Sequence, residues 1–123
     1  MAIIYTEAVK NARLSAVVTQ IGTTGVIEIG TTGMASVLAT ITLGNPAGTV
    51  TGGVLTFSGF PRSDTAADAT GIAAAARIRT ASGGTDIVTG LTVGTSGTDI
   101  VLDSTNITAG QTVTLNSAAI THA

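Results

Sequence analysis

Acid–base chemistry in this chain would have to use its seven carboxylates and its single histidine. The carboxylates are Glu7, Glu28, Asp64, Asp68, Asp86, Asp99 and Asp103. His122 is one residue from the end of the sequence, where chains usually fray, so it is a poor general base. No carboxylate lies in an aromatic-lined stretch of the kind that holds a sugar or a nucleotide. A hydrolase with a site built from Asp and Thr residues is therefore the weakest functional hypothesis, and we predict no catalytic residues and no enzyme activity.

Two pairs of aspartates have a spacing that could ligate Ca²⁺: Asp64 with Asp68, and Asp99 with Asp103. Neither pair belongs to a loop of about twelve residues with alternating acids and a final Glu. The chain has no cysteine, which excludes disulfides and thiolate metal sites. Its glycines match neither the phosphate-binding loop nor the dinucleotide-binding turn. We predict no metal and no cofactor, and we expect the aspartates to cap turns and to blunt strand edges.

The charge distribution argues against nucleic-acid and membrane partners. Charged residues make up only 10% of the chain, and of the five basic residues only Arg77 and Arg79 are close together. A phosphate-binding surface needs clustered Lys and Arg side chains. The sequence has no apolar window long enough for a spanning helix, and its N-terminal residues lack the features of a secretory signal. We expect synthesis in a cytoplasm, and a surface with so little charge favours burial within an assembly.

The composition predicts one domain over residues 1–123 with a modestly stable core. Hydrophobic residues make up 44% of the chain, but many are alanines, and the only aromatic side chains are Tyr5, Phe57 and Phe60. Valine, isoleucine, leucine and alanine must therefore fill the core. Alanine contributes much less on burial than the larger aliphatic residues. We therefore expect a homo-oligomer or a larger assembly, with a self-sufficient monomer as the alternative.

Residues 6–21 have the pattern of an amphipathic helix within an N-terminal arm that spans residues 1–22. Thr6 can cap the first turn, Glu7 suits the positive end of the helix, and Gly22 provides a stop. The apolar positions follow the helical spacing: Leu14, Val17, Val18 and Ile21. We expect this stripe to cover one end or face of a sheet. The alternative is a docking arm for a neighbouring subunit.

From residue 25 to residue 123 the pattern changes to short β-type runs separated by glycine. The runs are residues 26–29, 37–43, 53–58, 69–80, 86–93, 99–102 and 112–120. Apolar and polar residues alternate clearly in 38–43 and 112–116, and the chain contains 24 threonines, whose branched side chains suit a pleated, half-exposed sheet. The regular spacing of short strands and turns predicts a mostly β fold, either a sandwich or a barrel.

Two features organise the second half of the chain. The sequence Gly-Thr-Asp-Ile-Val occurs at residues 84–88 and again at 97–101, which indicates two strands of one sheet entered through similar glycine turns. Ser82, Gly83 and Gly84 are typical of a hairpin turn.

This hairpin would place Ile78 in the core and point Arg77 and Arg79 outward. The alternative for residues 73–76 is the start of a helix, because alanine has the best helix propensity.

The loop at residues 59–68 carries an aromatic residue, a proline, an arginine and two aspartates. Binding residues are often carried on such loops. The alternative is structural, with Phe60 plugging the end of the fold and Pro61 stiffening the crossover.

The segments at residues 53–71 and 91–115 resemble, in their Thr-, Gly- and Ala-rich texture, small virion proteins of tailed bacteriophages. Residues 53–71 read GVLTFSGFPRSDTAADATG. Residues 91–115 read LTVGTSGTDIVLDSTNITAGQTVTL. The chain is similar in size and character to the decoration, or cement, proteins of phage heads, a likeness that carries no site residues.

The resemblance implies an antiparallel β-sandwich of jelly-roll type over residues 25–123, sitting on the outer capsid surface as a homodimer or homotrimer between major capsid proteins. The leading hypothesis is therefore a structural capsid decoration protein of the virion. The alternative is a phage tail or fibre module that binds a host-surface receptor or glycan.

Overall fold

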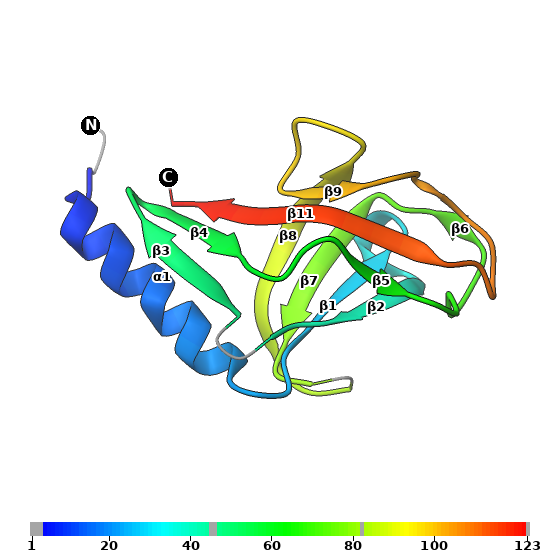
Figure 1. The fold of residues 1–123 in the computed structure, drawn as a ribbon, viewed down its shortest axis with the longest axis horizontal. Coiled ribbons are helices and arrows are strands. Elements are labelled where there is room, and N and C mark those ends of the chain that lie inside the picture. The colour runs from blue at the N-terminus through cyan, green and yellow to red at the C-terminus, as the bar shows by residue number, and fades with distance from the viewer. Residues whose placement is uncertain (1–3, 45–46, 82, 123) are drawn as a thin grey trace.

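The computed structural model describes residues 4–44, 47–81 and 83–122 and has a mostly β fold with one N-terminal helix (Figure 1). The elements are α1 (Glu7–Ile21), β1 (Val26–Gly30), a 3₁₀ turn η1 (Thr32–Met34), β2 (Val37–Thr42), β3 (Gly48–Thr51), β4 (Val54–Phe57), β5 (Arg62–Asp64), β6 (Gly71–Ile72), β7 (Ala75–Arg79), β8 (Asp86–Gly94), β9 (Ile100–Leu102), β10 (Asn106–Ile107) and β11 (Val113–Thr121). The mostly β prediction and the N-terminal helix are thus confirmed.

The main sheet has the strand order β2-β1-β7-β8-β9-β11-β4-β3, with β5 also paired to β11, and it curls strongly into a half-barrel. This corrects the expected antiparallel jelly-roll sandwich. The sheet is mixed, because β8 and β9 pair in parallel through Val93 with Ile100 and Gly94 with Val101. A separate two-stranded sheet joins β6 to β10. Figure 1 shows β11 running along the length of the molecule, where it pairs with β5, β9 and β4 in turn.

Irregular registers give a physical reason for the curl. The pairing shifts between β1 and β2, twice between β7 and β8, and once between β9 and β11. A bulge bends its strand and increases the local right-handed twist. Such shifts in three strand pairs spread along the sheet help a single sheet to wrap around its own core, where we had expected two facing sheets.

Helix α1 packs against its own fold, as the core-covering interpretation predicted. The Thr6 side chain accepts a hydrogen bond from the Val9 N–H at 3.4 Å, and Gly22 ends the helix with a φ of 61°. Leu14 and Ile21 are buried in the core. The helix contacts β3, β4 and β8, so the predicted apolar stripe covers the chain's own sheet. Within the described residues, no helix has the length and apolar character of a bilayer-spanning segment.

The predicted hairpin between residues 76–80 and 86–89 is present as the antiparallel pair β7–β8. Ile78 is fully buried opposite Val88, which confirms its predicted place in the core. Residues 75–79 form strand β7, so the helical alternative for this segment is wrong. Ser82 of the predicted turn lies outside the described residues. The two repeat copies lead into β8 and β9, which are neighbours in one sheet, as expected.

Some β segments were not predicted from the sequence. β3, β5 and β10 were absent from the expected runs, and the run at 69–80 is divided into β6 and β7. Apart from Phe57, the buried core is aliphatic, as the composition predicts. Its largest fully buried side chains are Ile21, Ile27, Ile29, Leu38, Ile41, Leu55, Ile78, Ile100, Leu102, Ile107, Leu115 and Val113.

Candidate functional site

The structure places His122 just after β11, next to the residue that precedes the N-cap of α1. The rings of His122 and Tyr5 meet edge to face, with their centroids 5.7 Å apart. The Arg13 guanidinium stacks over the Tyr5 ring at 4.5 Å. The backbone N–H of His122 donates to the Gly53 carbonyl at 2.9 Å. These contacts join the helix to the last strand, and they give His122 a packing role at this end of the fold.

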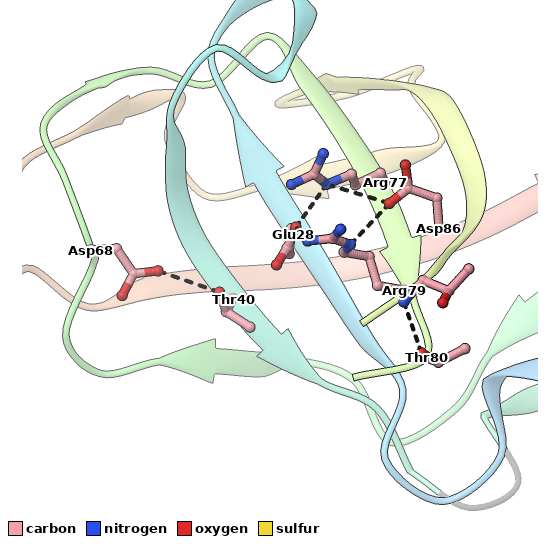
Figure 2. A network of polar contacts seen from close by, with 8 residues as sticks. Glu28, Thr40, Asp68, Arg77, Arg79, Thr80 and Asp86 are labelled. Atoms are coloured by element: carbon pink, nitrogen blue, oxygen red, sulfur yellow. Dashed lines mark hydrogen bonds and ion pairs between the residues drawn. The ribbon is translucent and has the colours of Figure 1, made fainter. Parts of the chain in front are cut away.

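Asp64 and Asp68, which were considered as calcium ligands, both reach Thr40 on β2. Asp64 Oδ2 accepts from the Thr40 N–H at 3.0 Å, and Asp64 Oδ1 accepts from the Ala66 N–H, also at 3.0 Å. Asp68 Oδ2 accepts from the Thr40 hydroxyl at 3.3 Å, a contact drawn in Figure 2. Asp64 therefore caps a turn and satisfies a strand edge, as we expected of the aspartates.

Asp99 is engaged in a different part of the molecule. Its Oδ2 accepts from both the backbone N–H and the hydroxyl of Thr92, each at 3.0 Å. Asp103 is exposed, and its backbone N–H donates to the Thr114 carbonyl. Among the described residues, no three His, Cys, Asp or Glu side chains form a group that could hold a metal ion.

The loop at residues 59–68 is ordered by strand pairing and side-chain contacts. Its middle part is β5, which pairs with β11. Phe60 is half-buried against the core, and the Arg62 guanidinium lies 5.8 Å from the centre of its ring. These contacts favour the structural alternative for Phe60 over a binding role.

A network of charged side chains on β1, β7 and the start of β8 was not predicted from the sequence (Figure 2). Glu28 is only 4% exposed, and Arg77 lies directly opposite it in the β1–β7 register. Glu28 Oε1 lies 2.7 Å from Arg77 Nε and 3.5 Å from a terminal nitrogen of Arg79. Asp86 Oδ1 lies 2.9 Å from Arg79 Nε and 3.9 Å from Arg77 Nε.

This network has two positive and two negative groups. A buried carboxylate is tolerated only when it is paired and hydrogen-bonded, which Arg77 provides for Glu28. The Arg79 Nε–H makes no hydrogen bond within the described residues although Asp86 is close, so that contact is an ion pair alone. Arg77 and Arg79 lie on the face opposite the buried Ile78, as predicted, but they are half-buried rather than freely solvated.

The sequence did contain a signal for this network. Glu28 interrupts the apolar run of β1, and two arginines alternate with Ile78 in β7. An acid in one strand and bases at alternate positions of another predict a cross-strand ion pair if the two strands are neighbours. That last condition was not visible, because β1 and β7 are separated by more than forty residues.

The large hydrophobic side chains that remain exposed gather mainly at the α1 end of the molecule. Ile4 is 84% exposed, and Tyr5 and Val9 are exposed near it. We call these three residues the α1-end patch. Ile72, on β6, is 64% exposed and lies at the other end of the long axis (Figure 1).

Within the part of the chain that the structure describes, no pocket is found. Comparisons of the chain with models of protein families, with curated proteins and with solved structures find no match. The candidate site is therefore a surface, the α1-end patch. The charged network of Glu28, Arg77, Arg79 and Asp86 and the aspartate contacts described above hold the sheet.

Proposed function

We propose that this chain is a structural virion protein that binds the outer surface of a tailed-phage capsid. It stabilises the capsid by clamping neighbouring major capsid proteins, after synthesis in the host cytoplasm. The resemblance of residues 53–71 and 91–115 to phage decoration proteins supports the choice of partner. It is a likeness of texture, and the half-barrel stands in place of the jelly-roll sandwich that it implied.

The observation that carries the proposal is the α1-end patch. Ile4, Tyr5 and Val9 are exposed together, and Arg13 stacks on Tyr5 beside them. Exposed apolar clusters mark interaction surfaces more often than single exposed residues do. Tyrosine and arginine are also the side chains most enriched among the residues that dominate binding energy. We therefore place the capsid contact at this end of the molecule.

The proposed effect on the capsid is mechanical. Packaged DNA pushes outward on the head, and a protein that spans two capsomers adds interface free energy that must be lost before they separate. Many copies with weak individual contacts become collectively strong when they are presented together. Self-association into a homodimer or homotrimer belongs to the same proposal, because it would give each clamp more than one capsid contact.

The alternative, a tail or fibre module that binds a receptor or glycan, has weaker support. Sugar-binding sites usually need exposed aromatic faces for stacking. Phe57 is buried, Phe60 is half-buried against the core, and Tyr5 is already stacked by Arg13. No observation in the described residues favours the alternative over the capsid contact.

The decisive experiment is addition of the purified protein to phage heads that lack it, followed by cryo-electron microscopy. We expect density at the junctions between capsomers, with α1 nearest to the capsid. Bare heads, or density confined to the tail, would overturn the proposal.

Variants of exposed apolar residues at the two ends of the molecule test which end contacts the capsid. The double substitution Ile4→Ser with Val9→Ser should weaken binding to heads by at least about tenfold, by the loss of buried apolar area. Ile72→Ser removes a similarly exposed side chain from the other end and should bind like the wild type. Equal loss in both variants would contradict a contact at the α1 end.

A further inference from the structure

The outer edge of β2 is closed by side chains rather than by another strand. β2 ends the order of the main sheet, and it pairs with β1 on one side only. On its other side, three backbone groups of β2 form hydrogen bonds: the Leu38 carbonyl, the Thr40 N–H and the Thr42 carbonyl. They come from every second residue. This alternation is what an open antiparallel edge presents. Such an edge is a template on which another strand can pair.

Residues 62–68, which we call the strap, satisfy all three of these groups. The Asp68 N–H donates to the Leu38 carbonyl at 2.7 Å. The Thr40 N–H donates to Asp64 Oδ2 at 3.0 Å, and Arg62 donates from a terminal nitrogen to the Thr42 carbonyl at 3.3 Å. Two of the three bonds therefore use a side chain. The strap imitates a strand at this edge without forming a ladder with β2.

The other side of the strap is held by the backbone. β5 pairs with β11 in the register Val113 with Asp64, Thr114 with Ser63, and Leu115 with Arg62. The Ala67 N–H donates to the Gln111 carbonyl at 2.9 Å. The strap is thus anchored on β11 and reaches β2 through Arg62, Asp64 and Asp68, whose Oδ2 also accepts from the Thr40 hydroxyl at 3.3 Å. A change in Arg62 or Asp64 removes one of the bonds that cover the β2 edge and leaves the Asp68 N–H bond to Leu38 in place.

We propose that the strap is an autoinhibitory contact that prevents β2 from pairing with β2 of a second copy. β2 reads Val-Leu-Ala-Thr-Ile-Thr and carries no charge, so two copies would meet without like-charge repulsion. Antiparallel pairing centred on Thr40 sets Leu38 of one copy opposite Thr42 of the other, and it satisfies the same three groups in both chains. Two β2 strands are thus complementary to each other. The charged side chains next to the β2 edge belong to the strap. This proposal is independent of capsid binding.

The test compares Asp64→Ala with the wild-type protein by hydrogen exchange and by mass measurement in solution. Asp64→Ala removes the acceptor of the Thr40 N–H, so at low concentration the Thr40 amide should exchange at least about tenfold faster. At high concentration the mass should reach twice the wild-type value, and the Thr40 amide should become protected again. Asp103→Ala, which removes an exposed aspartate of equal charge, should behave like the wild type.

A second substitution identifies the pairing surface. The Thr40 N–H points outward from β2 at the centre of this pair, so adding Thr40→Pro to the Asp64→Ala variant removes the central donor of a β2–β2 pair and should restore the wild-type mass. Association that persists in this double variant would overturn the proposal. So would Asp64→Ala that keeps the wild-type mass at high concentration, whether or not the Thr40 amide exchanges faster. If Asp64→Ala does not fold, Arg62→Ala provides the same test of whether uncovering the β2 edge leads to a dimer. Of the three β2 groups it frees only the Thr42 carbonyl, although it also removes the Arg62 bond to the Ser58 carbonyl, so it should double the mass only at higher concentration. Wild-type mass at every concentration would again overturn the proposal.

Discussion

The Glu28 carboxylate lies 2.7 Å from Arg77 Nε, between two strands that are far apart in the sequence. Every residue of β1 is buried, so Glu28 is shielded from water on a strand with both faces covered. The contact therefore favours the observed register of β1 with β7, in which Glu28 faces Arg77. Loss of the Glu28–Arg77 contact should lower the stability of the whole sheet.

We predict that Glu28→Ala lowers the free energy of unfolding by about 3 kcal/mol, because it removes the buried carboxylate that pairs with two half-buried guanidinium groups and leaves them only the exposed Asp86. Urea denaturation measures this loss. Asp86→Ala is the control, since the Asp86 side chain is 44% exposed and its ion pair should contribute less than about 1 kcal/mol. Equal losses in the two variants would show that burial of Glu28 is not the deciding factor.

Asn11 should be a second stabilising contact, between α1 and the β3–β4 hairpin. Its Oδ1 accepts from the Gly53 N–H at 2.9 Å, at a turn where Gly52 and Gly53 both have positive φ. We predict that Asn11→Ala costs about 1–2 kcal/mol, because the Gly53 N–H loses its acceptor. Thermal unfolding checks this, with Asn11→Asp as the variant that keeps an acceptor oxygen. If Asn11→Asp is as unstable as Asn11→Ala, the hydrogen bond is not responsible.

The parts of the fold that could be predicted are those with local signals. α1 has a cap, a stop and a helical stripe, and β1, β2, β8 and β11 have enough alternating or apolar residues to stand out. β5 and β10 are short, and they exist only because distant strands offer them partners. A pattern within a few residues carries no information on such partners.

The half-barrel and the charged network were hidden for the same reason. The shift between Leu115 and Ser117, one of those that bend the sheet, depends on where β9 meets β11. Glu28 and Arg77 have complementary charges in the sequence, but only the β1–β7 pairing brings them together. Asp64 was correctly expected at a turn and a strand edge, although the sequence did not show that the edge was that of β2.

Gly48 provides a prediction about packing. A Cβ added at this position would collide with the Thr56 carbonyl oxygen and would lie 2.8 Å from Phe57 Cα, both backbone atoms of the paired strand β4. Because backbone atoms cannot rotate away, Gly48→Ala should cost about 2–3 kcal/mol. Chemical denaturation measures the loss. The neighbouring Thr49→Ala, at an exposed position, is the control and should cost less than about 1 kcal/mol. A stable Gly48→Ala protein would mean that β3 can move away from β4.

The final prediction separates folding from binding at Tyr5. The Tyr5 ring contacts Arg13 and His122, but it is an exposed residue, so Tyr5→Ala should cost only about 1 kcal/mol of stability. Binding to phage heads should fall much more, by at least about tenfold, because the ring is the largest side chain of the α1-end patch. Tyr5→Phe keeps the ring and should retain both properties. A large loss of stability in Tyr5→Ala, with binding proportional to the folded fraction, would assign the ring to the fold and remove it from the proposed interface.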